Sequence, residues 1–223
     1  MRHIERLPEP DILHEKHDEW QRKYEEKLQQ HPSARPDHSK YAHPAIAGTL
    51  QCMSHGKCFY CETRLSGAYK EIDHHIEVSI DPSKAYDWTN LYLACDNCNN
   101  KLNHYTIPVS EALDPCRNSD EEIQQALTFD GEMIGSMPNS QLGLKTIQKY
   151  KLDTALLDLR RSRHLRFLCE TVDKIKDSML ENGRRTATDE EKNQIRAFMQ
   201  ADRPYSLMCQ IYINRHYAKL LAD

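Results

Sequence analysis

The sequence predicts an α+β protein in which a small cysteine-stapled core with short strands is embedded in a mainly α-helical chain. Two observations support this fold class. Two Cys-x-x-Cys pairs enclose a segment with strand-like apolar groups, and apolar residues recur at helical spacing on both sides of it. We therefore divide the chain into an N-terminal arm with helices (1–50), the stapled core (51–110), an acidic irregular segment with a hairpin (111–143) and a C-terminal helical region (144–223).

The N-terminal part begins with Pro8 and Pro10, which favour an extended backbone. We expect a helix from Asp11, whose side chain can cap it, to about Gln30. A Pro-rich stretch interrupts the helical pattern, and a second, short helix is expected over residues 44–53.

The acidic segment after the core contains many turn formers and few periodic signals. Within it, the stretch TFDGEMIG (128–135) predicts a β-hairpin with a two-residue Asp-Gly turn. From Leu142 onward the apolar spacing becomes helical. We expect a long helix over 153–181 that ends at Asn182-Gly183. Its buried face is predicted to contain Leu156, Leu157, Leu165, Leu168, Val172 and Ile175.

Two further helices are predicted near the C-terminus. Thr188 followed by Glu191 has the spacing of a capping box and opens a helix that reaches about Gln200. Pro204 opens the last helix. The chain therefore ends in a helical region with no internal repeat.

The net charge of −4 argues weakly against a nucleic-acid partner, but the charge is unevenly distributed. Residues 144–185 carry 11 basic and 6 acidic residues, whereas residues 106–143 carry one basic and seven acidic residues. The basic region could hold nucleic acid or a partner protein, and a solvated helix face is an equally good interpretation. Its densest cluster comprises Arg160, Arg161, Arg163 and Arg166.

The sequence contains no apolar run near the roughly 18 residues that a membrane helix needs. Its first residues lack the apolar core of a signal peptide. We therefore expect a cytoplasmic protein, whose eight cysteines serve as metal ligands or buried thiols rather than as disulfides.

The two cysteine pairs are Cys58/Cys61 and Cys95/Cys98. Four thiolates with this spacing fit a closed structural Zn²⁺ site with Zn–S bonds of about 2.3 Å. Four unrelated buried thiols are the alternative, which the repetition of the pair disfavours. The other cysteines lack such spacing and are expected to be small buried residues; they are Cys52, Cys116, Cys169 and Cys209.

Polar residues lie at both edges of the stapled segment. Asp73-His74 heads a strand-like stretch, and Asn99 follows the second cysteine pair directly. A zinc ion that staples both ends would bring these residues together. A neutral histidine can deprotonate water, and carboxylate and amide oxygens can hold a Mg²⁺ that stabilises charge on a phosphate. The pattern favours phosphodiester hydrolysis over the alternative of polar strand residues and helix caps.

The segments CFYCE, EIDHHIEVS and YDWTNLYLACDNCNNK together resemble HNH nucleases, which have a ββα-metal core. Looser similarity in MRHIERLPEPDIL and TIQKYKLDTALLDLRRSR extends the resemblance to HNH proteins of the PtuB type, from Septu and retron-associated anti-phage defence systems. The resemblance is strong over residues 56–103 and loose elsewhere.

This resemblance implies roles for individual residues. His74 corresponds to the general base, Asp73 and Asn99 correspond to ligands of the catalytic Mg²⁺ or Mn²⁺, and Asn90 corresponds to a strand-shaping residue. His75 and Glu77 replace the usual apolar residue and proline. His75 is therefore a second candidate for the base, and Glu77 a candidate for an additional metal or water contact.

Lys101 could steady the scissile phosphate, although an exposed helix residue is the slightly preferred interpretation. The resemblance also implies an endonuclease that is the effector subunit of a hetero-oligomer with a PtuA-type ATPase. Its substrate would be DNA or RNA, and in retron systems a reverse transcriptase and its msDNA would be further partners.

Two other functional classes compete with this interpretation. A non-catalytic zinc-stapled adaptor for the ATPase would need no divalent metal and would retain full function after His74→Ala. A sequence-reading DNA-binding protein is disfavoured, because no basic recognition helix lies beside the cysteine pairs.

Overall fold

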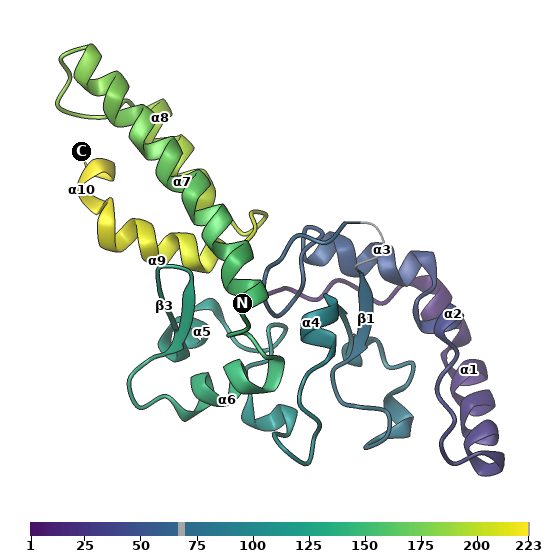
Figure 1. The fold of residues 1–223 in the computed structure, drawn as a ribbon. Coiled ribbons are helices and arrows are strands. Elements are labelled where there is room, and N and C mark those ends of the chain that lie inside the picture. Colours follow the sequence, from purple (N-terminus) through teal and green to yellow (C-terminus); the bar gives the residue numbers. More distant parts are fainter. Residues whose placement is uncertain (67–69, 223) are drawn as a thin grey trace.

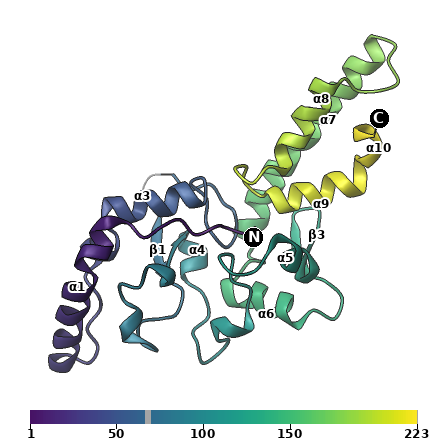
Figure 2. The same ribbon diagram turned by 180° about the vertical axis from the view of Figure 1, so that it is seen from behind.

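The computed structural model describes residues 1–66 and 70–222, and it confirms an α+β architecture in which helices dominate. The molecule is elongated. Helix α1 (Asp11–Gln30) stands at one end, and α7 (Ala155–Glu181) projects from the other end as an arm together with α8 (Asp189–Arg196) (Figures 1 and 2). The stapled core lies between these two ends, so its surroundings come from both halves of the chain.

The stapled core consists of two short antiparallel strands followed by a helix. β1 (Glu71–His74) pairs with β2 (Leu91–Ala94), which is buried along its whole length. α4 (Asp96–Asn99) follows β2 and packs against β1, while α3 (Pro44–Met53) packs against β2. The register pairs Glu71 with Ala94, Ile72 with Leu93, Asp73 with Tyr92, and His74 with Leu91.

The strand-like pattern predicted after Asp73-His74 ends sooner than expected. Residues 75–80 form bends and turns, and the chain then enters two single-turn 3₁₀ helices, η2 (Pro82–Lys84) and η3 (Trp88–Asn90). Pro82 at the first position of η2 and Asp81 as its cap favour this early turn. The loop therefore folds back over β1 instead of extending the sheet.

The N-terminal helices have the predicted bounds. The predicted cap of α1 is wrong by one residue, since Pro10 holds the cap position and Asp11 is the first helical residue. A carboxylate in the first turn still interacts favourably with the helix dipole. The Pro-rich stretch contains one additional turn of helix, α2 (His38–Tyr41), which places Tyr41 beside the core.

The segment predicted to be irregular contains a helix that the sequence interpretation missed. α5 (Asp120–Ala126) begins at a capping box formed by Ser119 and Glu122. The predicted hairpin is confirmed as β3 (Leu127–Asp130) and β4 (Met133–Ser136). Because Asp130 pairs with Met133, the two turn residues lie one position later than the predicted Asp-Gly pair.

The C-terminal region is helical as predicted. α7 ends at Asn182, followed by Gly183 with a positive φ, and the Thr188/Glu191 capping box opens α8. Leu156 is 45% exposed, which contradicts the prediction that it shares the buried face of α7. The other helical elements are α6 (Gln141–Tyr150), η5 (Ala197–Met199), α9 (Ser206–His216) and α10 (Ala218–Leu221).

The extended first residues run across the core and fix it to the acidic segment. The backbone N–H of Ile4 donates to the carbonyl of Pro115 at 2.8 Å, and Arg6 donates to the carbonyl of Trp88 at 2.7 Å. The Trp88 indole in turn donates to the carbonyl of Leu7 at 2.9 Å. Across the described residues, every helix is too short or too polar to cross a membrane.

Candidate functional site

The four paired cysteines form one compact cluster. The sulfur atoms of Cys58, Cys61, Cys95 and Cys98 lie within 4.8 Å of one another, and all four residues are buried. The Cys61 and Cys95 sulfurs are 3.7 Å apart. A tetrahedron of sulfurs around Zn²⁺, with bonds of about 2.3 Å, has edges of about 3.8 Å. The donor set and its spacing therefore fit a zinc ion.

The remaining cysteines lie outside the cluster. Cys209 is buried as predicted, and Cys116 and Cys169 are half-buried. Cys52 is exposed on α3, which contradicts the prediction of a buried residue. Its side chain lines the small pocket beside the extended first residues instead of entering the core.

The cysteine cluster explains how distant residues meet. The backbone N–H of Phe59 donates to the carbonyl of Leu93 at 2.9 Å, which fixes the first cysteine pair to β2. The second pair lies at the start and in the body of α4, which packs on β1. Residues immediately after Cys98 are thereby placed against the Asp73-His74 end of β1.

A pocket of about 730 Å³ opens at this junction. Asp73, His74, Glu77, Asn99 and Lys101 all line it, together with residues of the Pro-rich stretch and the end of α1. The structure thus brings together five of the seven polar residues considered from the sequence. The other two, His75 and Asn90, lie outside the pocket lining.

The imidazole of His74 has a defined tautomer. Its Nε2 lies 2.9 Å from the carbonyl oxygen of Ala85, and a carbonyl can only accept, so Nε2 carries the proton. Nδ1 is left as the lone-pair acceptor. Burial lowers the pKa of His74, and the bond to Ala85 opposes this shift only in part. Tyr41 packs edge-on against the ring at 4.7 Å and restricts its rotation.

The carbonyl of Ala85 is held by helix α1. Gln21 donates to the carbonyl of Pro82 at 3.1 Å, at the start of η2. Trp20 packs on Tyr86 with ring centroids 5.8 Å apart, directly after Ala85. An element remote in sequence therefore sets the position of the group that orients His74.

His75 lies in a different environment from His74. It is buried and stacks on Tyr92 at 4.4 Å, with Nδ1 at 3.3 Å from the hydroxyl of Tyr60. Burial lowers the pKa of His75 to about 4, against the opposing effect of Asp114, whose Oδ2 lies 3.6 Å from Nε2. Of these two adjacent histidines, His74 therefore lines the pocket and His75 is buried among aromatic rings.

Asp73 is neutralised by Lys101 inside the protein. The Lys101 ammonium lies 2.6 and 2.5 Å from the two carboxylate oxygens and 2.7 Å from the carbonyl of His74. The Tyr60 hydroxyl also donates to Asp73 at 2.6 Å. The side chain of Lys101 is only 4% exposed, so the preferred interpretation of Lys101 as an exposed helix residue is wrong. A buried carboxylate needs a compensating cation, and Lys101 provides one.

The two asparagines have different tasks. Asn99 donates through Nδ2 to Glu71 at 2.7 Å, which fixes its amide and leaves the carbonyl oxygen as an acceptor. Asn90 accepts from the N–H of Ile76 at 2.7 Å and donates to the carbonyls of Ile76 and Lys84, each at 3.0 Å. Asn90 thus closes the loop after β1 without entering the pocket.

Glu77 contributes a buried, unsatisfied oxygen to the pocket. Its Oε1 lies 3.0 Å from the ammonium of Lys149, a fully buried residue of α6 that also donates to the carbonyl of Leu102. Its Oε2 is buried and has no hydrogen-bond partner. The sequence interpretation missed Lys149, Tyr41 and Tyr60. Tyr60 stands between the first two cysteines and Lys149 lies in the loosely similar segment TIQKYKLDTALLDLRRSR, whereas Tyr41 lies in neither motif.

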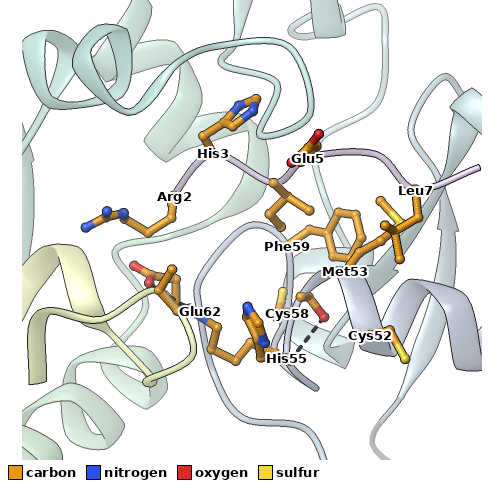
Figure 3. Close-up of a pocket in the computed structure, with 14 residues that line it drawn as sticks. Arg2, His3, Glu5, Leu7, Cys52, Met53, His55, Cys58, Phe59 and Glu62 are labelled. Carbon is orange, nitrogen blue, oxygen red and sulfur yellow. Dashed lines mark hydrogen bonds and ion pairs between the residues drawn. The ribbon is translucent and has the colours of Figure 1, made fainter. Parts of the chain in front are cut away.

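A smaller pocket of about 280 Å³ lies between the extended first residues and the first cysteine pair (Figure 3). Its buried carboxylate, Glu62, accepts from the amino group of Met1 at 3.2 Å and from Ser206, and Lys57 lies 3.6 Å away. Burial favours a raised pKa for Glu62, but these cationic and hydrogen-bonding neighbours hold it at about 2. The Glu62 carboxylate already has its cationic and hydrogen-bonding partners, so we place the candidate functional site in the larger pocket.

Comparison with known proteins identifies the class of this core. Residues 58–111 match the family model described as HNH endonuclease. The stapled core, with its two strands and short helix, is therefore an HNH domain. The chain is also 37% identical over 65 residues to the Septu protein PtuB of Bacillus thuringiensis, a match that covers 28% of this chain and 25% of that protein. The HNH domain is thus of the PtuB type, as the resemblance indicated, and the matched part spans a quarter of the relative's length.

Proposed function

We propose that this protein is an endonuclease that hydrolyses phosphodiester bonds in nucleic acid, with His74 as the general base. The observation that carries the proposal is the hydrogen bond from His74 Nε2 to Ala85, which leaves a basic Nδ1 in a pocket shared with Asp73 and Asn99. Such a nitrogen can take a proton from water near neutral pH. The HNH domain supports the same reaction class.

The pocket residues fit a hard divalent cation. We propose that the Asp73 carboxylate and the Asn99 carbonyl oxygen hold Mg²⁺ or Mn²⁺, and the unsatisfied Oε2 of Glu77 is a third candidate ligand. When bound, the ion would stabilise negative charge on the scissile phosphate and the leaving oxygen. Because Lys101 already neutralises Asp73, the cation would compete with its ammonium.

The other residues act as supports in this proposal. Tyr60 orients the Asp73 carboxylate, and Glu71 orients the amide of Asn99. Asn90 holds the loop that carries Glu77. The four cysteines, which we propose bind Zn²⁺, keep α4 against β1 and take no part in the reaction.

We further propose that the protein acts in anti-phage defence with a PtuA-type ATPase. The support is its likeness to a protein named for the Septu system. The substrate class is DNA or RNA, and a net charge of −4 agrees with a nuclease that relies on a partner to hold much of its substrate. Copurification with an ATPase but no reverse transcriptase would place the protein in a Septu-like system, and copurification with both an ATPase and a reverse transcriptase carrying msDNA would place it in a retron.

The decisive experiment compares His74→Ala with His75→Phe. Purified full-length protein, with its ATPase partner, is incubated with plasmid DNA or RNA across a Mg²⁺ titration. We expect His74→Ala to lose about 10²- to 10⁴-fold in cleavage rate. His75→Phe should keep a rate close to that of the wild type, because His75 lies outside the pocket and a phenylalanine ring keeps its stacking on Tyr92. Zinc content and thermal unfolding verify that both variants are folded.

Two outcomes would contradict the proposal. Wild-type cleavage by folded His74→Ala would remove His74 as the base, and selective loss in His75→Phe would assign the role to His75. Full defence activity with no dependence on divalent metal and no effect of His74→Ala would identify the protein as a non-catalytic adaptor.

A further inference from the structure

A shallow groove of about 450 Å³ lies on the arm side of the molecule, away from the His74 pocket. Its walls come from the first half of α7, the residues after the first cysteine pair and the chain entering α9. No residue lines both this groove and the His74 pocket among those that the structure describes.

The groove carries positive charge that no acidic residue offsets. Arg64, Arg160 and Arg163 line it, and no Asp or Glu is among the described lining residues. Arg64 donates to the carbonyls of His55 and Asp202, at 3.2 and 2.9 Å, which holds its guanidinium in place without neutralising it.

The other two arginines of the predicted basic cluster behave differently. Arg161 is buried, pairs with Asp158 at 3.1 Å and lies over the ring of Phe129, so it belongs neither to a binding surface nor to a solvated helix face. Arg166 lies 4.0 Å from Glu170 on the exposed face. Within residues 1–66 and 70–222, Arg160 and Arg163 make no ion pair that resembles either of these.

The groove also offers an exposed aromatic ring and an unused hydrogen-bonding atom. Phe167 is 57% exposed beside Arg163, although a phenylalanine usually gains stability by burial. The Nε2 of His164 is buried and has no hydrogen-bond partner. Arginines that bind phosphates next to an aromatic ring that stacks on a base are the recurring features of sites for single-stranded nucleic acid.

The groove is joined to the HNH domain by short polar contacts. The hydroxyl of Tyr205, a lining residue, lies 3.0 Å from Thr63 Oγ1, which lies 3.1 Å from the sulfur of Cys61. A ligand in the groove would therefore be held in a defined position relative to the cysteine cluster, and through α4 to the His74 pocket.

We propose that this groove binds a single-stranded segment of nucleic acid, with Arg64, Arg160 and Arg163 on its phosphates and Phe167 stacked on a base. The inference rests on the proposed nuclease function and names a second contact for its substrate. An acidic surface of a partner protein would also satisfy the arginines, but it would not explain the exposed ring of Phe167 beside them.

The test measures binding without cleavage. Full-length His74→Ala protein is titrated against a labelled single strand of about 30 nucleotides, of DNA and of RNA, over a range of salt concentrations. Adding Arg160→Ala and Arg163→Ala should weaken binding about tenfold and lower the slope of log K against log salt by about 1.4, since each lost phosphate contact contributes about 0.7 for single strands. Adding Phe167→Ala instead should weaken binding about 5- to 150-fold with little change of slope.

A matched control removes two α7 cations that lie outside the groove. Arg166→Ala with Lys176→Ala deletes the same charge from residues that face Glu170 and Asp173, and we expect affinity and slope to stay close to those of the parent. Equal affinity and slope in the groove variant and the control would overturn the proposal. Loss of the ATPase with unchanged nucleic-acid affinity would also overturn it, in favour of a protein interface.

Failure of the nuclease proposal gives a different pattern. If the groove variants lose binding while wild-type protein cleaves nothing under any metal condition, the groove is a nucleic-acid site on a protein that is not a nuclease. If His74→Ala protein binds neither DNA nor RNA, the groove proposal fails independently of any cleavage result.

Discussion

Replacing Lys101 with methionine tests whether its ammonium occupies the place of a divalent cation. Methionine keeps much of the length of the side chain but removes the charge that lies 2.5 and 2.6 Å from the Asp73 oxygens. The two side chains are 4% and 6% exposed, so hydration of the unpaired carboxylate would stay incomplete. Only the hydroxyl of Tyr60 would continue to stabilise the carboxylate.

The expected loss of stability is large in the absence of metal. Removing one partner of a buried ion pair costs about 3–5 kcal/mol, because the other charge stays buried and uncompensated. For a chain of this size, about 1 kcal/mol corresponds to roughly 2–4 °C in Tm, so we expect Tm to fall by about 6–20 °C. A divalent cation should restore much of this loss, since a ligand present at 100 times its Kd stabilises by about 2.7 kcal/mol.

The assay is thermal unfolding of the zinc-loaded full-length protein, with and without Mg²⁺ or Mn²⁺. Lys145→Met is the matched control, because Lys145 pairs with Glu111 at the surface, where both side chains are at least 40% exposed. That change should cost about 0–1 kcal/mol and leave the response to metal unchanged. The reasoning is refuted if Lys101→Met is as stable as the control without metal, or if metal raises the Tm of wild type and variant equally.

Three further predictions follow from the site. Removing zinc with a chelator should unfold the HNH domain cooperatively, because the four thiols meet only in the folded state. The expected signal is a loss of near-UV circular dichroism with release of one Zn²⁺ per chain. Retained structure in metal-free, reduced protein would contradict this prediction. His75 has a pKa of about 4 in the folded protein, below its usual 6.5, so the unfolded chain binds more protons between these two pH values. The stability contribution of neutral His75 should therefore be fully present above pH 6.5 and fall by about 3 kcal/mol as the pH approaches 4. Urea unfolding should show that His75→Phe lacks this component. Asn90→Ala should lower the free energy of unfolding by about 1–3 kcal/mol and should also lower the cleavage rate. The reason is that the Ile76 N–H and the carbonyls of Ile76 and Lys84 lose their hydrogen-bond partner. Unchanged urea unfolding and cleavage would show that this loop holds its shape without Asn90.

Sequence reasoning predicted which residues share the larger pocket, because they adjoin motifs with short, fixed spacing. Asp73 and His74 head a strand, and Asn99 follows a cysteine that must reach the cluster. Helix ends were equally predictable where capping chemistry is local, as at Thr188 and Glu191. The same signature at Ser119 and Glu122 was present but overlooked, and it accounts for the missed helix α5.

The sequence did not predict which of two adjacent histidines, His74 or His75, lines the pocket, or which of two adjacent arginines, Arg160 or Arg161, is buried. Side chains alternate between the two faces of a strand, so the position where β1 ends decides which histidine faces the pocket. That end is held by hydrogen bonds from the N–H groups of His75 and Ile76 to Asn90, which is distant in sequence. Arg160 and Arg161 differ because Phe129, from a distant hairpin, lies under only one of them. The Lys101 side chain is buried because it pairs with the Asp73 carboxylate. Asp73 becomes buried only when the chain folds, so the sequence pattern does not indicate this pair.

The support of Ala85 by helix α1 limits how this HNH domain can be used. The acceptor that fixes the His74 tautomer is positioned by Trp20 and Gln21, which lie outside the matched residues 58–111. An excised domain would keep every motif residue and all four cysteines, yet its imidazole could turn and its proton could move to the other nitrogen. The matched residues alone therefore do not define the geometry of the candidate site, and α1 belongs to that site as much as the strands do.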